Sequence, residues 1–167
     1  PGSFKIFDGL TILSLSHNKI ETLPKNFFLE LPKLERLDLS YNFMIGIPEN
    51  MSSVKLKELQ LQGNRIDRLP ESIGGCQNLE RLLIGDALSG NPLVVLPSNF
   101  SELLFLKELS LSHCSLAAFP KVSLQLGHLE TLDLSSNYIT ALPANLSSMR
   151  SLRYLDMSRN EIEEIPE

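Results

Sequence analysis

Apolar and polar residues alternate in short stretches that return at a nearly constant interval along the chain. The stretches Leu13-Ser14-Leu15, Leu37-Asp38-Leu39 and Leu132-Asp133-Leu134 each place two leucines around a polar residue. A period of two is typical of a short strand with one buried face. Because every copy runs in the same direction along the chain, we expect these strands to stack in parallel.

Each alternating stretch belongs to a longer frame that occurs seven times. The first copy, from Leu10 to Pro24, has the spacing L-x-x-L-x-L-x-x-N-x-I-x-x-L-P. Measured from proline to proline, the units contain 23, 24, 22, 27, 23, 23 and 23 residues. The fourth unit carries four extra residues in the segment 85–90, where two glycines predict a loop at the strand exit. We expect this loop to rise beside the sheet and to add Asp86 and Leu88 to a binding site.

An asparagine follows the alternating stretch in six units, and a cysteine takes its place in the fifth. The chain leaves the strand here, so the amide can pair with backbone groups of the neighbouring unit that would otherwise be buried without partners. We therefore interpret the column as a structural ladder. Its members are Asn18, Asn42, Asn64, Asn91, Cys114, Asn137 and Asn160.

The frame resembles that of leucine-rich repeat proteins over the whole chain. The segment from Leu69 to Leu79 is similar to the L-P-x-x-I-G-x-L-x-N-L pattern of 23-residue repeats, although Cys76 replaces a leucine. This pattern is familiar from intracellular signalling scaffolds of the Ras-suppressor type and from the repeat region of Roco proteins. The resemblance implies an α/β solenoid shaped as a curved horseshoe. Its parallel β-sheet would form the concave face, and irregular turns or short helical pieces would form the convex face.

Residues 1–167 are expected to form a single array of seven units. The repeat pattern is already present at Pro1 and continues to Pro166, and neither end shows a polar capping unit. Solenoids need such caps for solubility. We therefore expect the array to be a piece of a longer chain without its capping modules.

Composition narrows the classes of partner. The chain has 34 leucines and a formal charge of −5, from 20 acidic and 15 basic residues. This balance argues against nucleic acid and anionic lipid as partners. Because no stretch approaches the ~18 consecutive apolar residues of a spanning helix, we expect no membrane insertion.

Residues with catalytic or ligand-binding chemistry are few. No glycine-rich phosphate motif is present, and His17, His113 and His128 lack metal-ligand spacing. We therefore expect no enzymatic activity, no cofactor and no metal in this chain.

Two features point to different compartments. Cys76 and Cys114 fall in different columns and should not pair, which favours a reducing, cytoplasmic location. The alternative is an extracellular location, because Asn50, Asn99 and Asn145 each begin an N-x-Ser glycosylation sequon.

Binding is expected on the outward-facing strand positions. Seven strands at ~4.8 Å spacing make a sheet roughly 29 Å across, which suits a folded protein partner better than a metabolite. Leu83, Tyr41 and Tyr154 are the expected apolar anchors, and Asp133 with Asp156 could dock a basic side chain. The predicted contact residues are Arg36, Asp38, Tyr41, Glu58, Gln60, Arg81, Leu83, Asp86, Glu108, Asp133, Tyr154 and Asp156.

Each part of this surface also has a simpler interpretation. The charges of Arg36, Glu58, Arg81 and Glu108 alternate in sign and could pair with one another within the chain. The two aspartates could equally form a solvated acidic face without a role.

The sequence therefore predicts a protein recognition or scaffolding module of a larger signalling protein, acting through its concave face. One alternative is the ectodomain of a secreted or cell-surface receptor. Another is the regulatory repeat region of a GTPase or kinase whose catalytic domain lies outside this chain. The oligomeric state stays open.

Overall fold

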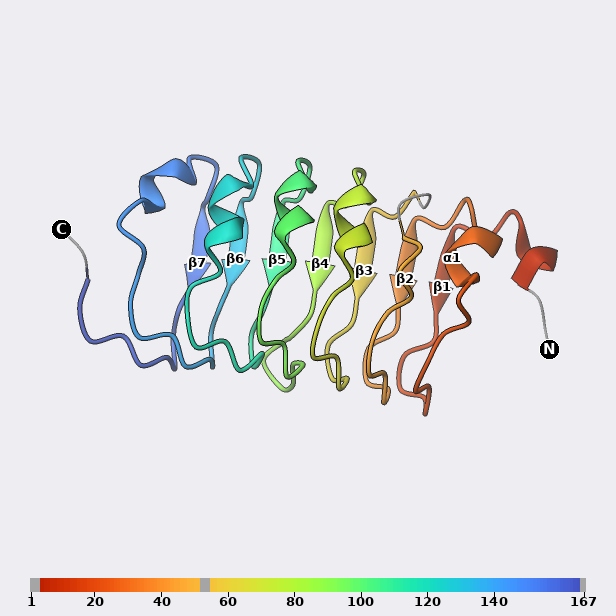
Figure 1. Ribbon diagram of the computed structural model, residues 1–167, viewed down its shortest axis with the longest axis horizontal. Coiled ribbons are helices and arrows are strands. Elements are labelled where there is room, and N and C mark those ends of the chain that lie inside the picture. The colour runs from red at the N-terminus through yellow and green to blue at the C-terminus, as the bar shows by residue number, and fades with distance from the viewer. Residues whose placement is uncertain (1–3, 52–54, 166–167) are drawn as a thin grey trace.

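The computed structural model describes residues 4–51 and 55–165, which form a solenoid with one parallel sheet. Seven strands lie side by side in chain order within the described residues (Figure 1). They are β1 (Ile12–Ser14), β2 (Arg36–Asp38), β3 (Glu58–Gln60), β4 (Arg81–Leu83), β5 (Glu108–Ser110), β6 (Thr131–Asp133) and β7 (Tyr154–Asp156). The predicted fold class is confirmed.

The middle residue of every strand is a leucine, and those of β2 to β6 are buried in the core. Leu59, Leu82 and Leu109, in the central strands, have no exposed surface. Full burial of one leucine side chain stabilises a fold by roughly 1.5–3 kcal/mol. Each leucine packs on the units next to its own, so the stability of the array comes from stacking.

Short helices cover the convex side of the sheet (Figure 1). Three of them begin directly after a unit proline, whose carbonyl accepts a hydrogen bond from the first turn: the Phe100 N–H donates to the Pro97 oxygen at 3.1 Å. The expected short helical pieces are η1 (Phe4–Phe7), α1 (Phe27–Glu30), η2 (Glu71–Gly75), η3 (Ser98–Glu102), η4 (Lys121–Gln125) and η5 (Leu146–Ser148).

The asparagine column lies at the strand exits and binds backbone groups of two adjacent units. The Asn137 Nδ2 donates to the carbonyl oxygens of Leu111 and Leu134, both at 2.9 Å. Its Oδ1 accepts the N–H groups of Cys114 and Leu116, both at 3.0 Å. Equivalent amide bonds to a neighbouring unit are made by Asn42, Asn64, Asn91 and Asn160.

The ladder changes at Cys114, which is fully buried. Its thiol donates only a long bond of 3.4 Å to the Ser112 carbonyl oxygen. In the preceding unit the Leu93 N–H donates instead to the Asn91 carbonyl oxygen, at 2.7 Å. The Leu93 N–H thus finds its acceptor within the fourth unit, whereas the equivalent N–H of other units donates to the ladder asparagine of the next unit.

Candidate binding surface

The concave face consists of the first and third residues of each strand together with the residues at the strand exits. The first residues form the row Ile12, Arg36, Glu58, Arg81, Glu108, Thr131 and Tyr154, and the third residues form the row Ser14, Asp38, Gln60, Leu83, Ser110, Asp133 and Asp156. Ten of the twelve predicted contact residues lie in these rows. Tyr41 and Asp86 lie at the strand exits.

The alternating charges of the first row pair with one another. Arg81 places Nη1 3.2 Å from a Glu58 carboxylate oxygen and Nε 2.8 Å from one of Glu108. Arg36 approaches Glu58 at 4.0 Å. Exposed pairs of this kind each contribute ~0–1 kcal/mol. The row is therefore largely neutralised within the chain, as the simpler interpretation holds.

A second charge row, which sequence reasoning missed, lies one residue before the strands. Its pairs are Glu35 with Lys57 at 2.9 Å, Glu80 with Lys107 at 2.7 Å, and Glu130 with Arg153 at 4.0 Å. The hydrogen bond between Lys107 and Glu80 raises the pKa of the ammonium and lowers the pKa of the carboxyl. The signal was present in the alternating dipeptides Glu-Arg and Lys-Glu before successive strands.

Aspartates of the third row accept hydrogen bonds from a serine two residues later. The pairs are Asp38 with Ser40, Asp133 with Ser135, and Asp156 with Ser158. Asp133 Oδ1 accepts both the Ser135 N–H at 2.9 Å and its hydroxyl at 2.7 Å. The bonds from Ser158 lower the pKa of Asp156. These donors stabilise carboxylates that lie on adjacent strands, and the repeated D-x-S pattern could have indicated them.

Tyr41 reaches across one unit to the loop of the fourth. Its hydroxyl donates to Asp86 Oδ2 at 2.7 Å, and its ring stacks on His17 with centroids 4.5 Å apart. Gly63 lies under the ring with φ of +69°, and a Cβ there would be 2.6 Å from Tyr41 Cδ1. Tyr41 is thus half-buried and engaged within the fold.

The loop 85–90 is fixed by its own hydrogen bonds. Asp86 Oδ1 accepts the N–H groups of Leu88 at 2.9 Å and Ser89 at 3.0 Å. His113 Nδ1 lies 3.0 Å from the Asp86 carbonyl oxygen. Both carboxylate oxygens of Asp86 therefore have partners inside the chain, whereas the Leu88 side chain, 83% exposed, is available for binding.

Replacing Tyr41 with phenylalanine should lower the free energy of unfolding at neutral pH by about 1–2 kcal/mol, because a hydrogen bond to a charged group is lost. The bond to Asp86 raises the pKa of Tyr41 from 10.0 to about 12. Its contribution is therefore complete below pH 10 and disappears as the pH rises towards 12.

Urea unfolding of both proteins across this pH range measures the effect. The control is Tyr138→Phe, since Tyr138 is exposed and its hydroxyl has no hydrogen-bond partner among the described residues. A constant difference between wild type and Tyr41→Phe from pH 8 to 12 would contradict the predicted role of the bond.

The open part of the concave face lies towards β7. Tyr154 is 54% exposed, and the charge of Asp156 raises the pKa of its hydroxyl. A hollow of about 270 Å³ lies at the strand exits of this end, lined among others by Asp156, Ser136 and Arg159. Leu83, by contrast, is half-buried and therefore less exposed than alternation predicted. Alternation determines which face a side chain points to, but not how far its neighbours cover it.

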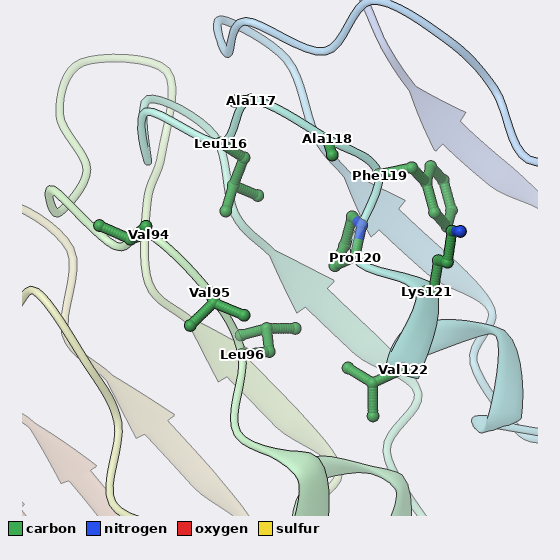
Figure 2. A pocket seen from close by; sticks show the side chains of 10 residues that line it. All are labelled: Val94, Val95, Leu96, Leu116, Ala117, Ala118, Phe119, Pro120, Lys121 and Val122. Atoms are coloured by element: carbon green, nitrogen blue, oxygen red, sulfur yellow. The ribbon is translucent and has the colours of Figure 1, made fainter.

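An apolar hollow of about 330 Å³, which sequence reasoning also missed, lies between the fourth and fifth units. Figure 2 shows Val94, Val95 and Leu96 on one side and the segment from Leu116 to Val122 on the other. Val94 and Val95 are 76% and 65% exposed. The third unit has Asp67-Arg68 at the corresponding positions, so the apolar character is not a feature of every unit.

Cys76 and Cys114 are buried and unpaired. Burial raises the pKa of each thiol to about 12. Both thiols therefore stay protonated and inert at neutral pH. Among the residues that the structure describes, no three His, Cys, Asp or Glu side chains gather to hold a metal, and no helix is long and apolar enough to span a bilayer.

Comparison with known families agrees with this geometry. A family model described as leucine rich repeat matches residues 1–44 and 105–162, more than half of the chain, and a second of the same description matches residues 55–76. This chain belongs to the leucine-rich repeat family.

Several leucine-rich repeat proteins are similar to it. Leucine-rich repeat-containing G-protein coupled receptor 5 of Rattus norvegicus is 34% identical over 72% of this chain and 13% of its own length. Fibromodulin of Bos taurus is 35% identical over 73% of this chain and 32% of its own. The probable serine/threonine-protein kinase pats1 of Dictyostelium discoideum is 34% identical over 72% of this chain and 4% of its own length. The chain thus spans a third or less of these relatives.

A solved leucine-rich repeat structure from Leptospira interrogans has the same fold. It superposes with a TM-score of 0.78 at 32% identity, covering 98% of this chain and 46% of that one. Leucine-rich repeat domains generally bind proteins, and the relatives of this leucine-rich repeat chain include secreted and cell-surface proteins.

Proposed function

We propose that this chain is the recognition module of a secreted or cell-surface protein and binds a protein partner on its concave face. The observation that carries the proposal is the exposed surface around Tyr154 and Arg159, on a sheet wide enough for a folded partner. Tyrosine and arginine are the residues that most often dominate binding energy at protein interfaces.

The neutralised charge rows favour this end of the face as the binding centre. A binding protein that contacts Arg81 or Glu108 would have to compete with the ion pair between them, in which Arg81 Nε lies 2.8 Å from a Glu108 carboxylate oxygen. Tyr154 is more than half exposed, and within the described residues its side chain makes a single hydrogen bond, a long one of 3.3 Å from its hydroxyl to Asp156. The remaining predicted contacts on β2 to β6 would then extend from β7 along the sheet and set specificity.

The secreted relatives support the extracellular location, and the cysteines do not oppose it. A fully buried thiol with a pKa of about 12 neither exchanges nor pairs, so it can persist in an oxidising compartment. The reducing compartment predicted from the same cysteines is therefore not required by them.

Binding to a panel of purified secreted and cell-surface ectodomains tests the proposal. The double variant Tyr154→Ala with Arg159→Glu should lower the affinity for a captured partner by roughly tenfold or more. The matched control is Tyr138→Ala with Arg150→Glu, which removes an equally exposed tyrosine and reverses an equal charge away from the sheet. Equal losses in both double variants, or none in the first, would contradict binding on the concave face.

A second candidate is the regulatory repeat region of a GTPase or kinase whose catalytic domain lies outside this chain, one of the alternatives that the sequence left open. Its support is the 34% identity to the probable kinase pats1. In that case the partner would be an intracellular protein, and the ectodomain panel would yield nothing while a panel of cytoplasmic proteins would yield the partner.

A further inference from the structure

The N-x-Ser sequons occupy one position of the repeat, two residues after a unit proline. Those at Asn99 and Asn145 lie wholly within the described residues and at the start of the convex helices η3 and η5. Asn50 is exposed as well, but Ser52 of its sequon lies outside the described residues. Two complete acceptor sites therefore face away from the sheet.

The middle residue of each sequon anchors it to the core. Phe100 is fully buried, and Leu146 is partly buried and packs against the core. Asn99 and Asn145 on one side of these anchors are exposed. Burial of the apolar residue thus holds each asparagine amide in solvent.

Neither asparagine amide has a role in the fold. Asn145 is the N-cap of η5 but makes no side-chain cap bond, and no hydrogen bond to the side chain of Asn99 occurs among the described residues. At η3 the backbone N–H groups of Ser98 and Asn99 are accepted by the Glu71 carboxylate instead. Asn137 of the ladder, by contrast, uses its amide fully.

We propose that Asn99 and Asn145 carry N-linked oligosaccharides, a modification that rests on the proposed passage through a secretory compartment. In the transfer, Nδ2 forms a bond to the anomeric carbon of an N-acetylhexosamine held on a lipid pyrophosphate donor. The bond from that carbon to the pyrophosphate oxygen breaks, lipid pyrophosphate leaves, and Nδ2 loses one proton to the transferase. The sequon hydroxyls are those of Ser101 and Ser147.

The convex wall has room for the sugars. Asn145 lines an open hollow of about 510 Å³ together with Leu124, Gln125 and Pro143. Asn99 and Asn145 lie two units apart, so each oligosaccharide would be attached to a different unit of the wall. Sugars there would cover the convex side and leave the concave face as the open surface for a protein partner.

Peptide mass spectrometry of the protein immunopurified from its source cells tests the assignment. Treatment with peptide N-glycosidase in heavy-oxygen water should convert Asn99 and Asn145 to labelled aspartate. Asn26 is the internal control, because it also lies two residues after a unit proline but has Phe28 in place of the hydroxyl residue. Unmodified Asn99 and Asn145 in the mature protein would overturn the proposal.

Variants of the chain secreted from cultured animal cells identify the sites independently. Ser101→Ala and Ser147→Ala should each remove one oligosaccharide from the intact mass while leaving the asparagine in place. If little protein is secreted, the same peptides are read from the endoplasmic reticulum fraction. Glycosylated protein without a concave-face partner would refute only the proposed function, and a secreted, partner-binding protein with bare asparagines would refute only the sugars.

Discussion

Replacing Asn137 with alanine is expected to lower the free energy of unfolding by about 3 kcal/mol, because three buried backbone groups lose their partner. The N–H groups of Cys114 and Leu116 both donate to Asn137 Oδ1 at 3.0 Å. The Leu111 carbonyl oxygen accepts from its Nδ2 at 2.9 Å. Alanine supplies none of these bonds, and Asn137 is too deeply buried for water to replace them. Urea unfolding followed by circular dichroism measures the change.

Alanine substitutions of two other asparagines serve as comparisons for this prediction. Asn18, at the exposed end of the ladder, bonds only to carbonyl oxygens of its own unit, so Asn18→Ala should cost less. Asn78 is exposed on the convex side, and Asn78→Ala should change stability by no more than about 0.5 kcal/mol. Three equal, small shifts of the urea midpoint would refute the ladder as a source of stability.

The regular part of the fold could be predicted because it follows from spacing alone. The alternation around Leu37 and Leu132 sets the buried face, and the recurring position of each strand within its unit sets the register, even where the unit length varies. The short helices directly after Pro70, Pro97 and Pro120 follow from local bonding, because each proline carbonyl accepts an N–H of the first turn.

The contacts between exposed side chains could be predicted less well. The bond from Tyr41 to Asp86 joins residues 45 positions apart, and its existence depends on where the four extra residues of the fourth unit return. Spacing does not determine that path. The hollow beside Val94 and Val95 likewise depends on small residues in the next unit, which leave space that a larger side chain would fill.

The sequence predicted on which face the candidate residues lie, but not which of them bind neighbours within the chain. Alternation puts Arg81 and Asp133 outward, yet both bind neighbours within the chain. Among the predicted contact residues in the strands, Arg36, with a side chain 62% exposed, and Tyr154, 54% exposed, stay more than half exposed. A surface position becomes a credible contact only when its partners within the fold are known.

Replacing Gly85 with alanine is expected to lower the free energy of unfolding by about 3 kcal/mol or more, because overpacking against rigid backbone cannot be relieved by a rotamer change. A Cβ at Gly85 would lie 1.6 Å from the Ser112 carbonyl oxygen and 2.7 Å from its carbon. The fourth and fifth units would have to separate at this point. That movement would strain the bond of 2.6 Å from the Ser110 hydroxyl to the Gly85 carbonyl oxygen.

Gly127→Ala is the matched control, because a Cβ there meets nothing within 4 Å. It should leave stability unchanged or raise it by up to about 1 kcal/mol, through the reduced entropy of the unfolded chain. Separation of the units at Gly85 should also displace the loop that holds Asp86, so Gly85→Ala should make a further Tyr41→Phe substitution nearly neutral. Equal urea midpoints for Gly85→Ala and Gly127→Ala would show that the close backbone approach does not constrain this position.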